Sequence, residues 1–204
     1  NGISIHIGSQ ITKLGPFKDS FKKVREIYLF LKKNNIILSS IDLGGGIGIF
    51  YEKNNSKKFK IKDYANIIEN YFSDLKVEII LEPGRYLVGS SGLLVSKVLR
   101  IKKGINKEFL IIDAGMNNLI RPSLYNTSHK ILPSTIIKKK NEYEVVGPIC
   151  ESSDIFAKNL KISTLKKNSL IVICSAGAYG SSMASDYNLR QKANEVMING
   201  NKII

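Results

Sequence analysis

The chain is poor in cysteine and histidine and has no long apolar run. It contains two cysteines and two histidines in 204 residues. Cys150 and Cys174 are too few for a disulfide framework, and His6 and His129 lie far apart with no cysteine pair near them, which excludes the usual zinc spacings. No apolar segment approaches the ~20 residues of a membrane-spanning helix. We therefore expect reduced thiols, no metal, no membrane contact and a cytoplasmic location.

The first residues, NGISIHIGSQ, lack an initiator methionine, a basic segment and the apolar core of a signal peptide. We interpret the chain as part of a longer protein. Apolar residues make up 43% of it and charged residues 24%, which is typical of a globular protein with a substantial core.

Acidic residues are outnumbered, with 17 Asp and Glu against 31 Lys and Arg, and the net charge is +14. Such a charge is compatible with a nucleic-acid-binding module, which would show a contiguous basic face and a steep salt dependence of binding. The lysines are scattered, however, and neither a basic helix nor an aromatic RNA-binding motif is present. We expect no nucleic-acid partner and keep this class as an alternative.

Strands and helices alternate in the first part of the chain. Apolar patterning predicts strands at residues 3–7, 39–43 and 77–82, and helices at about 17–34 and 62–73. This order is typical of parallel strands with crossover helices. After about residue 90, strand-like segments at 92–103, 107–115, 143–147 and 169–174 predict an antiparallel β domain, with one short helix after Ala176.

Two domains are therefore expected: residues 1–90 with β/α architecture and residues 91–204 with β architecture. Three β/α strands alone would leave an exposed parallel edge and a half-covered core. We expect further β/α units before residue 1.

Three glycine-containing loops follow the three predicted parallel strands: HIGSQ (6–10), GGGIG (44–48) and EPGR (82–85). Active sites of β/α barrels lie at this end of the strands. Glycines let backbone N–H groups approach an anion, and a following helix N-terminus would add its dipole. A tight turn explains the glycine triplet equally well when it is taken alone, but three such loops in register favour an anion site.

Six motifs, taken in order, resemble those of the diaminopimelate decarboxylase family: HIGSQ, DLGGGIGI, EPGR, DAGMNNLIRPSLY, GPICESSD and GAYGSSMASDYN. These are pyridoxal 5'-phosphate (PLP) enzymes of the alanine-racemase-like fold. The resemblance implies that residues 1–90 are the C-terminal portion of a PLP-binding TIM (β/α)8 barrel. It also implies that residues 91–204 are a C-terminal β-barrel or sandwich domain with substrate and dimer-interface motifs.

The resemblance places the cofactor mainly at the first three loops. His6 would stack on the cofactor ring, and Glu82 would pair with the pyridine nitrogen, which favours the electron-accepting form of the ring. A buried core histidine and a surface ion pair are the alternatives for these two residues. The cofactor-binding set is His6, Ser9, Gly44, Gly45, Gly46, Glu82, Gly84, Arg85 and Tyr179.

The resemblance also implies a proton donor and a substrate site. Cys150 would return a proton to Cα after CO2 leaves, a role that suits a neutral thiol. Glu151 would bind the amino group at the distal centre of the substrate, on a specificity helix formed by the ESSD segment. Cys150, His6 and Glu82 form the catalytic set, and the substrate-binding set is Arg85, Arg121, Tyr125, Glu151 and Tyr179.

Simpler explanations exist for several of these residues. Arg121 could cap backbone groups before Pro122, and Tyr125 and Tyr179 could be core aromatics. Cys174, within the apolar segment SLIVIC, is expected to pack in the core.

The implied activity is decarboxylation of meso-2,6-diaminopimelate to L-lysine and CO2, the last step of lysine biosynthesis. The Cys150 segment would enter the active site of the partner in a two-fold homodimer. The Schiff-base lysine lies on the first barrel strand in the family and is not in this chain, so this chain alone is expected to be inactive. A decarboxylase of ornithine, lysine or arginine and an inactive remnant remain alternatives.

Overall fold

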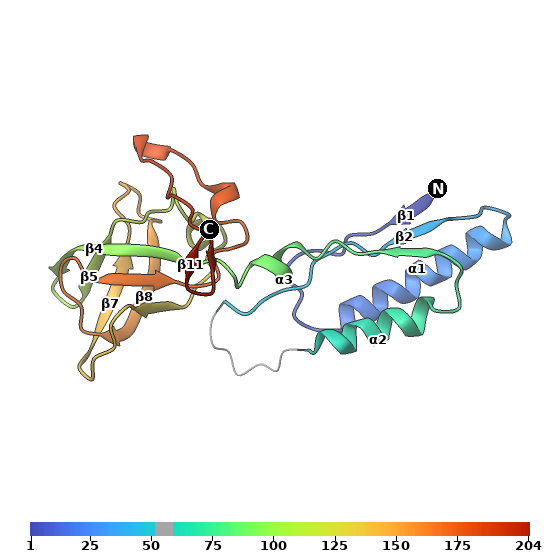
Figure 1. Cartoon of the computed structure of the whole chain (residues 1–204), viewed down its shortest axis with the longest axis horizontal. Coiled ribbons are helices and arrows are strands. Elements are labelled where there is room, and N and C mark those ends of the chain that lie inside the picture. Colours follow the sequence, from blue (N-terminus) through green and yellow to red (C-terminus); the bar gives the residue numbers. More distant parts are fainter. Residues whose placement is uncertain (52–58) are drawn as a thin grey trace. The chain divides into compact units, whose positions relative to one another are not determined.

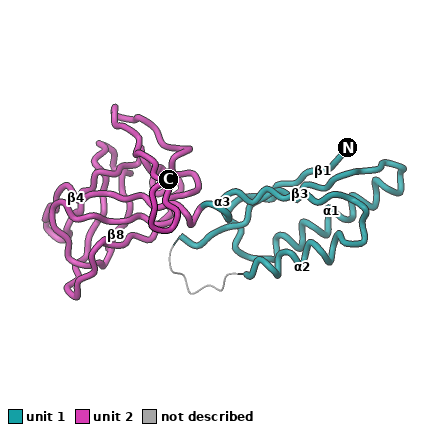
Figure 2. Tube along the Cα trace, viewed as in Figure 1, with its two compact units in different colours: residues 1–88 teal, residues 89–204 magenta. Residues whose placement is uncertain are grey.

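The computed structural model describes residues 1–51 and 59–204. The chain divides into two compact units, Asn1–Val88 and Gly89–Ile204, which are coloured separately in Figure 2. The division lies two residues before the boundary expected from the sequence. Within the described ranges, no helix has the length and apolar character needed to cross a membrane.

Unit 1 is built around a three-stranded parallel sheet in the order β1-β2-β3 (Figure 1). Its strands are short, and two helices lie on the connections between them, as the sequence predicts. A five-residue helix, α3, follows the third strand. The bounds are β1 Gly2–Ser4, α1 Gly15–Lys33, β2 Ser40–Asp42, α2 Ile61–Phe72, β3 Glu78–Ile80 and α3 Gly84–Val88.

The two long helices cover one face of this sheet and form a core rich in aromatic rings. Pro16 lies in the first turn of α1, where its missing N–H costs no hydrogen bond. From there the apolar side chains of α1 recur at helical spacing. The ring of Tyr64 in α2 meets those of Phe17 and Phe21 edge to face, with the Phe17 and Tyr64 centroids 5.0 Å apart. Arg25 of α1 donates two 2.6 Å hydrogen bonds to the Asp74 carboxylate just beyond α2, which links the middle of α1 to the end of α2.

Unit 2 is a six-stranded sheet in the order β6-β9-β4-β5-β7-β8. Its two edge strands, β6 and β8, contact each other, so the sheet nearly closes into a barrel around a continuous apolar core. The strands are β4 Leu94–Lys103, β5 Glu108–Ile112, β6 Ile131–Pro133, β7 Lys140–Val146, β8 Ile155–Ser163 and β9 Leu170–Ile173.

The expectation of a purely antiparallel unit 2 is wrong in one pairing. β5 and β7 run parallel, whereas the other pairs in this sheet are antiparallel. The chain between β5 and β7 is long enough for a crossover, and it holds helix α4 (Arg121–Tyr125) and β6. β6, β8 and α4 were not predicted. Two 3-10 turns, η1 Ser181–Met183 and η2 Tyr187–Leu189, and a hairpin of β10 Ile198–Asn199 and β11 Lys202–Ile203 complete the unit.

A closed eight-stranded barrel is not formed by the described residues. Unit 1 consists of parallel β/α units, and its assignment to a larger (β/α)8 barrel remains a proposal.

Candidate active site

The carboxyl ends of the three parallel strands bring the first three predicted loops together. Hydrogen bonds continue past the strands, from Ile5 N–H to the Asp42 carbonyl (3.0 Å) and from Leu43 N–H to the Ile80 carbonyl (2.9 Å). Glu82 N–H then donates to the Gly44 carbonyl (2.9 Å). The residues of HIGSQ, GGGIG and EPGR therefore lie at one edge of unit 1.

The glycine triplet forms a tightly packed backbone turn. Gly46 has a φ of +89°, and a Cβ there would lie 2.3 Å from the Gly8 carbonyl oxygen, so other residues would be strained. A Cβ on Gly45 would lie 2.2 Å from the Glu82 carbonyl oxygen. Asp42 fixes the turn by accepting the Gly44 N–H (2.8 Å). Within the described residues, the N–H groups of Gly45 and Gly46 donate to no backbone carbonyl. Such a turn is suited to a phosphate group.

Arg85 connects two of these loops. Its guanidinium donates to the Ser9 hydroxyl (2.9 Å) and to the Tyr51 hydroxyl, and its central carbon lies 5.8 Å from the centre of the Tyr51 ring. Tyr51 was not identified from the sequence, because no neighbouring residue suggests that its hydroxyl forms a hydrogen bond. A Cβ on Gly84, next to Arg85, would meet no atom within 4 Å, so this position faces open space.

The expected contribution of helix N-termini is not found. α1 begins at Gly15 and α2 at Ile61, so neither helix starts within HIGSQ or GGGIG. α3 begins in the EPGR loop but has only five residues. An anion at this edge would therefore depend on backbone and side-chain donors and not on the dipole of a long helix.

His6 and Glu82 are both exposed. Exposure excludes the alternative that His6 is a buried core histidine. Glu82 belongs to none of the ion pairs found among the described residues, so a surface ion pair does not explain it. Both side chains are accessible to solvent.

In unit 2, the buried guanidinium of Arg121 in α4 lies beside two tyrosine rings, one from α4 and one from the turn before η1. Arg121 is 4% exposed, and its central guanidinium carbon lies 5.2 Å from the Tyr125 ring centroid and 5.9 Å from that of Tyr179. The two rings are 52% and 42% exposed, so neither is a core aromatic. Tyr179 also has a φ of +60°, a strained conformation that bulky residues adopt mainly at functional sites. This arrangement suits an anionic group such as a carboxylate.

Cys150 and Glu151 lie exposed on the turn between β7 and β8. Residues 151–154 form this turn and not the helix that was expected; the Asp154 N–H closes it on the Glu151 carbonyl (3.1 Å). α4 is joined to the turn by a hydrogen bond from the Ser123 hydroxyl to the Ser153 carbonyl (2.7 Å). The candidate proton donor therefore sits on a segment anchored to the helix that carries Arg121.

Asp154 is a buried carboxylate that holds two segments together. It accepts the Met116 N–H (2.7 Å) and the Ile149 N–H (2.8 Å), and it is 3% exposed. Burial raises the pKa of this carboxyl above its ordinary value, although the two N–H groups and Arg190 act in the opposite direction. Its role was missed because the sequence marks ESSD only as an acidic, polar segment.

Tyr187 is a third residue that the sequence interpretation missed. Its hydroxyl donates a 2.5 Å hydrogen bond to the Glu151 carboxylate. The available signal was its position in the last motif, SDYN. Cys174 was expected to pack in the core and is half-buried. Its carbonyl oxygen is hydrogen-bonded to Nδ1 of His129 (2.9 Å).

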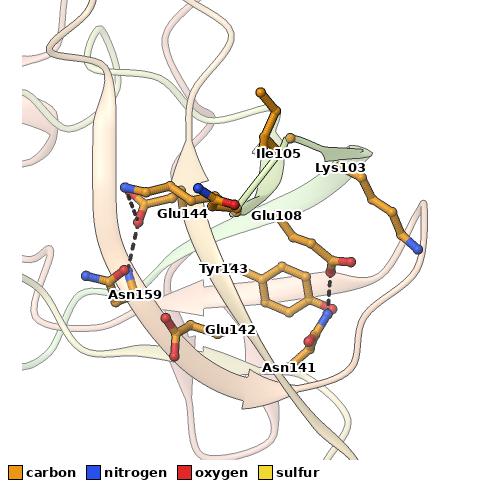
Figure 3. Close-up of a pocket in the computed structure, with 11 residues that line it drawn as sticks. Lys103, Ile105, Glu108, Asn141, Glu142, Tyr143, Glu144 and Asn159 are labelled. Carbon is orange, nitrogen blue, oxygen red and sulfur yellow. Dashed lines mark hydrogen bonds and ion pairs between the residues drawn. The ribbon is translucent and has the colours of Figure 1, made fainter.

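Two hollows lie on unit 2. One of about 290 Å³ runs between α4 and the turn that contains Ser152 and Ser153. The other, of about 440 Å³, lies between the β4–β5 connection and β7 (Figure 3). Its polar groups pair with one another, as Lys107 does with Glu144 and Asn141 with Glu108, and no predicted site residue lines it. Over residues 1–51 and 59–204, no cluster of histidine, cysteine or carboxylate side chains is arranged to hold a metal ion.

Residues 27–177 match the family model described as pyridoxal-dependent decarboxylase, C-terminal sheet domain, and the chain belongs to this family.

Relatives narrow the comparison to diaminopimelate decarboxylases. The Zymomonas mobilis enzyme of that name is 43% identical over 201 residues, covering 98% of this chain and 48% of that protein. The Aquifex aeolicus enzyme of that name is 40% identical over 203 residues, covering 99% and 48%. The crystal structure of the Helicobacter pylori diaminopimelate decarboxylase complexed with L-lysine has a TM-score of 0.93 and 44% identity over all of this chain and 50% of that one. The chain thus spans about half the length of these relatives.

Proposed function

We propose that the protein containing this chain decarboxylates meso-2,6-diaminopimelate to L-lysine and CO2, the last step of lysine biosynthesis. The observation that carries the proposal is the buried Arg121 guanidinium beside the rings of Tyr125 and Tyr179. The distal centre of diaminopimelate bears both a carboxylate and an ammonium group. Arg121 suits the first, and Glu151 from the second subunit of the dimer proposed below suits the second. Ornithine and arginine have no distal carboxylate, so they could use only the Glu151 half of this recognition.

The turn of Gly45 and Gly46 suits the phosphate of PLP, because the N–H groups of both residues donate to no backbone carbonyl among the described residues. Bound PLP would supply a ring that accepts the electrons left by loss of CO2. Glu82 would hold a proton at the ring nitrogen, and His6 would face the ring. The remaining proposed cofactor residues are Ser9, Gly44, Gly84, Arg85 and Tyr179.

Four residues of this chain would bind the substrate's charged groups or transfer its proton. Arg121, with Arg85, would bind carboxylate groups, and Glu151 would pair with the distal ammonium. Cys150 would donate the proton that replaces CO2 at Cα, which requires it to lie within hydrogen-bond reach of that carbon. Tyr125 and Tyr179 would orient the substrate beside Arg121.

We also propose a two-fold homodimer in which residues 150–154 serve the partner's active site, since in a two-fold assembly each subunit gives and receives the same segment. The lysine that carries the cofactor would come from the part of the protein outside this chain. Residues 1–204 by themselves would then bind PLP weakly and show no turnover. A cytoplasmic location also remains a proposal.

The test is CO2 release by the full-length protein loaded with PLP, with meso-diaminopimelate, ornithine, lysine and arginine compared at equal concentration. We expect turnover of diaminopimelate only. An Arg121→Met variant should lose most of this activity, while Arg100→Met, on the exposed side of β4, should retain it. Faster release from ornithine than from diaminopimelate would contradict the assignment.

A further inference from the structure

We infer that Tyr187 positions the Glu151 carboxylate and thereby sets how tightly the distal ammonium of the substrate is bound. This inference rests on the proposed function, because it assigns Tyr187 a part in that same site. Tyr187 belongs to the last motif of the chain and has no role in the sequence interpretation.

The first support is the contact itself. The Tyr187 hydroxyl donates to a carboxylate oxygen of Glu151 at 2.5 Å. The two residues lie 36 positions apart in sequence, on the η2 turn and on the β7–β8 turn. Glu151 is exposed and has three rotatable bonds, so without a partner its carboxylate would sample many positions. A hydrogen bond from a tyrosine removes much of this freedom before the substrate binds.

The second support is the way the Tyr187 segment is anchored at both ends. At one end, Ser185 N–H donates to the carbonyl of Asn117 (2.9 Å), a residue that is 1% exposed. At the other end, Arg190 donates to the Asp113 carbonyl (3.1 Å) and Asn118 to the Gln191 carbonyl (3.4 Å). Residues 185–191 are therefore fastened to residues 113–118, so the ring of Tyr187 projects from a fixed turn.

The third support is that the Glu151 turn is fastened to the same residues. The buried Asp154 accepts N–H groups from Met116 and from Ile149. Both partners of the Tyr187–Glu151 bond thus extend from segments attached to residues 113–118. A shared attachment keeps the hydroxyl and the carboxylate at a constant separation, which is the requirement for a positioning residue.

The consequence concerns binding more than chemistry. Without the Tyr187 hydroxyl, Glu151 would keep its charge, but its side chain would lose conformational entropy when substrate binds, which weakens binding. We expect Tyr187→Phe to raise KM for meso-diaminopimelate about fivefold, the equivalent of immobilising one flexible side chain, and to leave kcat within about twofold. Tyr187 is 47% exposed, so the melting temperature of Tyr187→Phe should equal that of wild type.

The experiment is a double-mutant cycle in the full-length, PLP-loaded protein, with wild type, Tyr187→Phe, Glu151→Gln and the double variant. If Tyr187 acts through Glu151, the double variant has the same KM as Glu151→Gln alone. Tyr71→Phe, on α2, is the matched control and should leave both constants unchanged. An unchanged KM in Tyr187→Phe, or a full additional loss in the Glu151→Gln background, would overturn the inference.

A second readout does not depend on turnover. The hydrogen bond to Glu151, followed by the charge of Glu151, desolvation and the charge of Cys150, raises the pKa of Tyr187 above the ordinary tyrosine value. A tyrosine titration followed by NMR with ¹³C-labelled tyrosine should show this pKa falling in Glu151→Gln. No fall would overturn the positioning role whatever the activity, whereas a clear fall in a protein that does not act on diaminopimelate would contradict only the proposed function.

Discussion

Replacing Asp154 should loosen the turn that carries Cys150 and Glu151. The carboxylate accepts the N–H groups of Ile149 and Met116 at 2.8 and 2.7 Å. In Asp154→Ala both donors lose their partner. A buried donor left unsatisfied costs about 1–3 kcal/mol, and Ile149 is 7% exposed while Met116 is half-buried, so water can reach only the second.

The free energy of unfolding should therefore fall by about 2–4 kcal/mol in Asp154→Ala, and by roughly half of that in Asp154→Asn, which keeps one acceptor oxygen. Urea unfolding of the full-length protein gives the total, and hydrogen exchange at the Ile149 and Met116 amides locates the loss. Asp186→Asn removes an exposed carboxylate and is the matched control, with an expected change below about 0.5 kcal/mol. Equal effects in Asp154→Ala and Asp186→Asn, or unaltered exchange at both amides, would refute the reasoning.

Three further predictions address the core of unit 1, the glycine turn of unit 1 and Arg121 of unit 2. Burial raises the pKa of Tyr64 to about 12, so the folded state favours the neutral phenol. The wild-type protein should therefore lose about 2 kcal/mol of stability as pH rises from 10 to 12. The urea midpoint of Tyr64→Phe should fall less than that of wild type over this range. Gly46→Ala should destabilise the protein by about 1–3 kcal/mol and weaken PLP binding, measured by absorbance titration, whereas Gly15→Ala, whose Cβ meets no atom within 4 Å, should do neither. Arg121→Lys should lower kcat/KM for diaminopimelate about 10- to 100-fold, because an ammonium cannot form two parallel bonds to a carboxylate; a loss below threefold would contradict a direct contact.

Periodicity revealed the regular elements of the chain and missed the irregular ones. The helices of unit 1 were predictable because Phe17, Phe21, Val24 and Tyr28 recur on one face and are all buried. β8 was missed because its pairing with β7 is broken by register shifts between Tyr143 and Val146. A break of this kind destroys the alternation of apolar and polar residues from which a strand is predicted.

Pairing direction was also beyond the reach of the sequence. Whether β5 pairs parallel or antiparallel with β7 depends on how the chain between them crosses the sheet, and α4 is too short, at five residues, to show helical periodicity. Strand segments overlapping β4, β5, β7 and β9 were predicted, but the order and direction in which they pair were not.

The residues of the candidate site were also predictable only in part. Motifs identified the residues that would touch a ligand, such as Arg121 and Glu151, because their chemistry is explicit. The residues that hold them, Asp154, Tyr187 and Tyr51, act through contacts 34 to 38 positions away in sequence. Such partners are found only when the chain is folded, since a single polar residue in a loop has many possible neighbours.

The central claim is that the three loops at the edge of the parallel sheet hold one PLP molecule. A crystal structure of the full-length protein grown with PLP measures this directly. We predict density for the phosphate about 3 Å from the N–H of Gly46, with the Glu82 carboxylate at the same hydrogen-bonding distance from the pyridine nitrogen. PLP bound elsewhere, or a phosphate beyond hydrogen-bond reach of residues 44–46 with Glu82 turned away from the ring, would contradict the account.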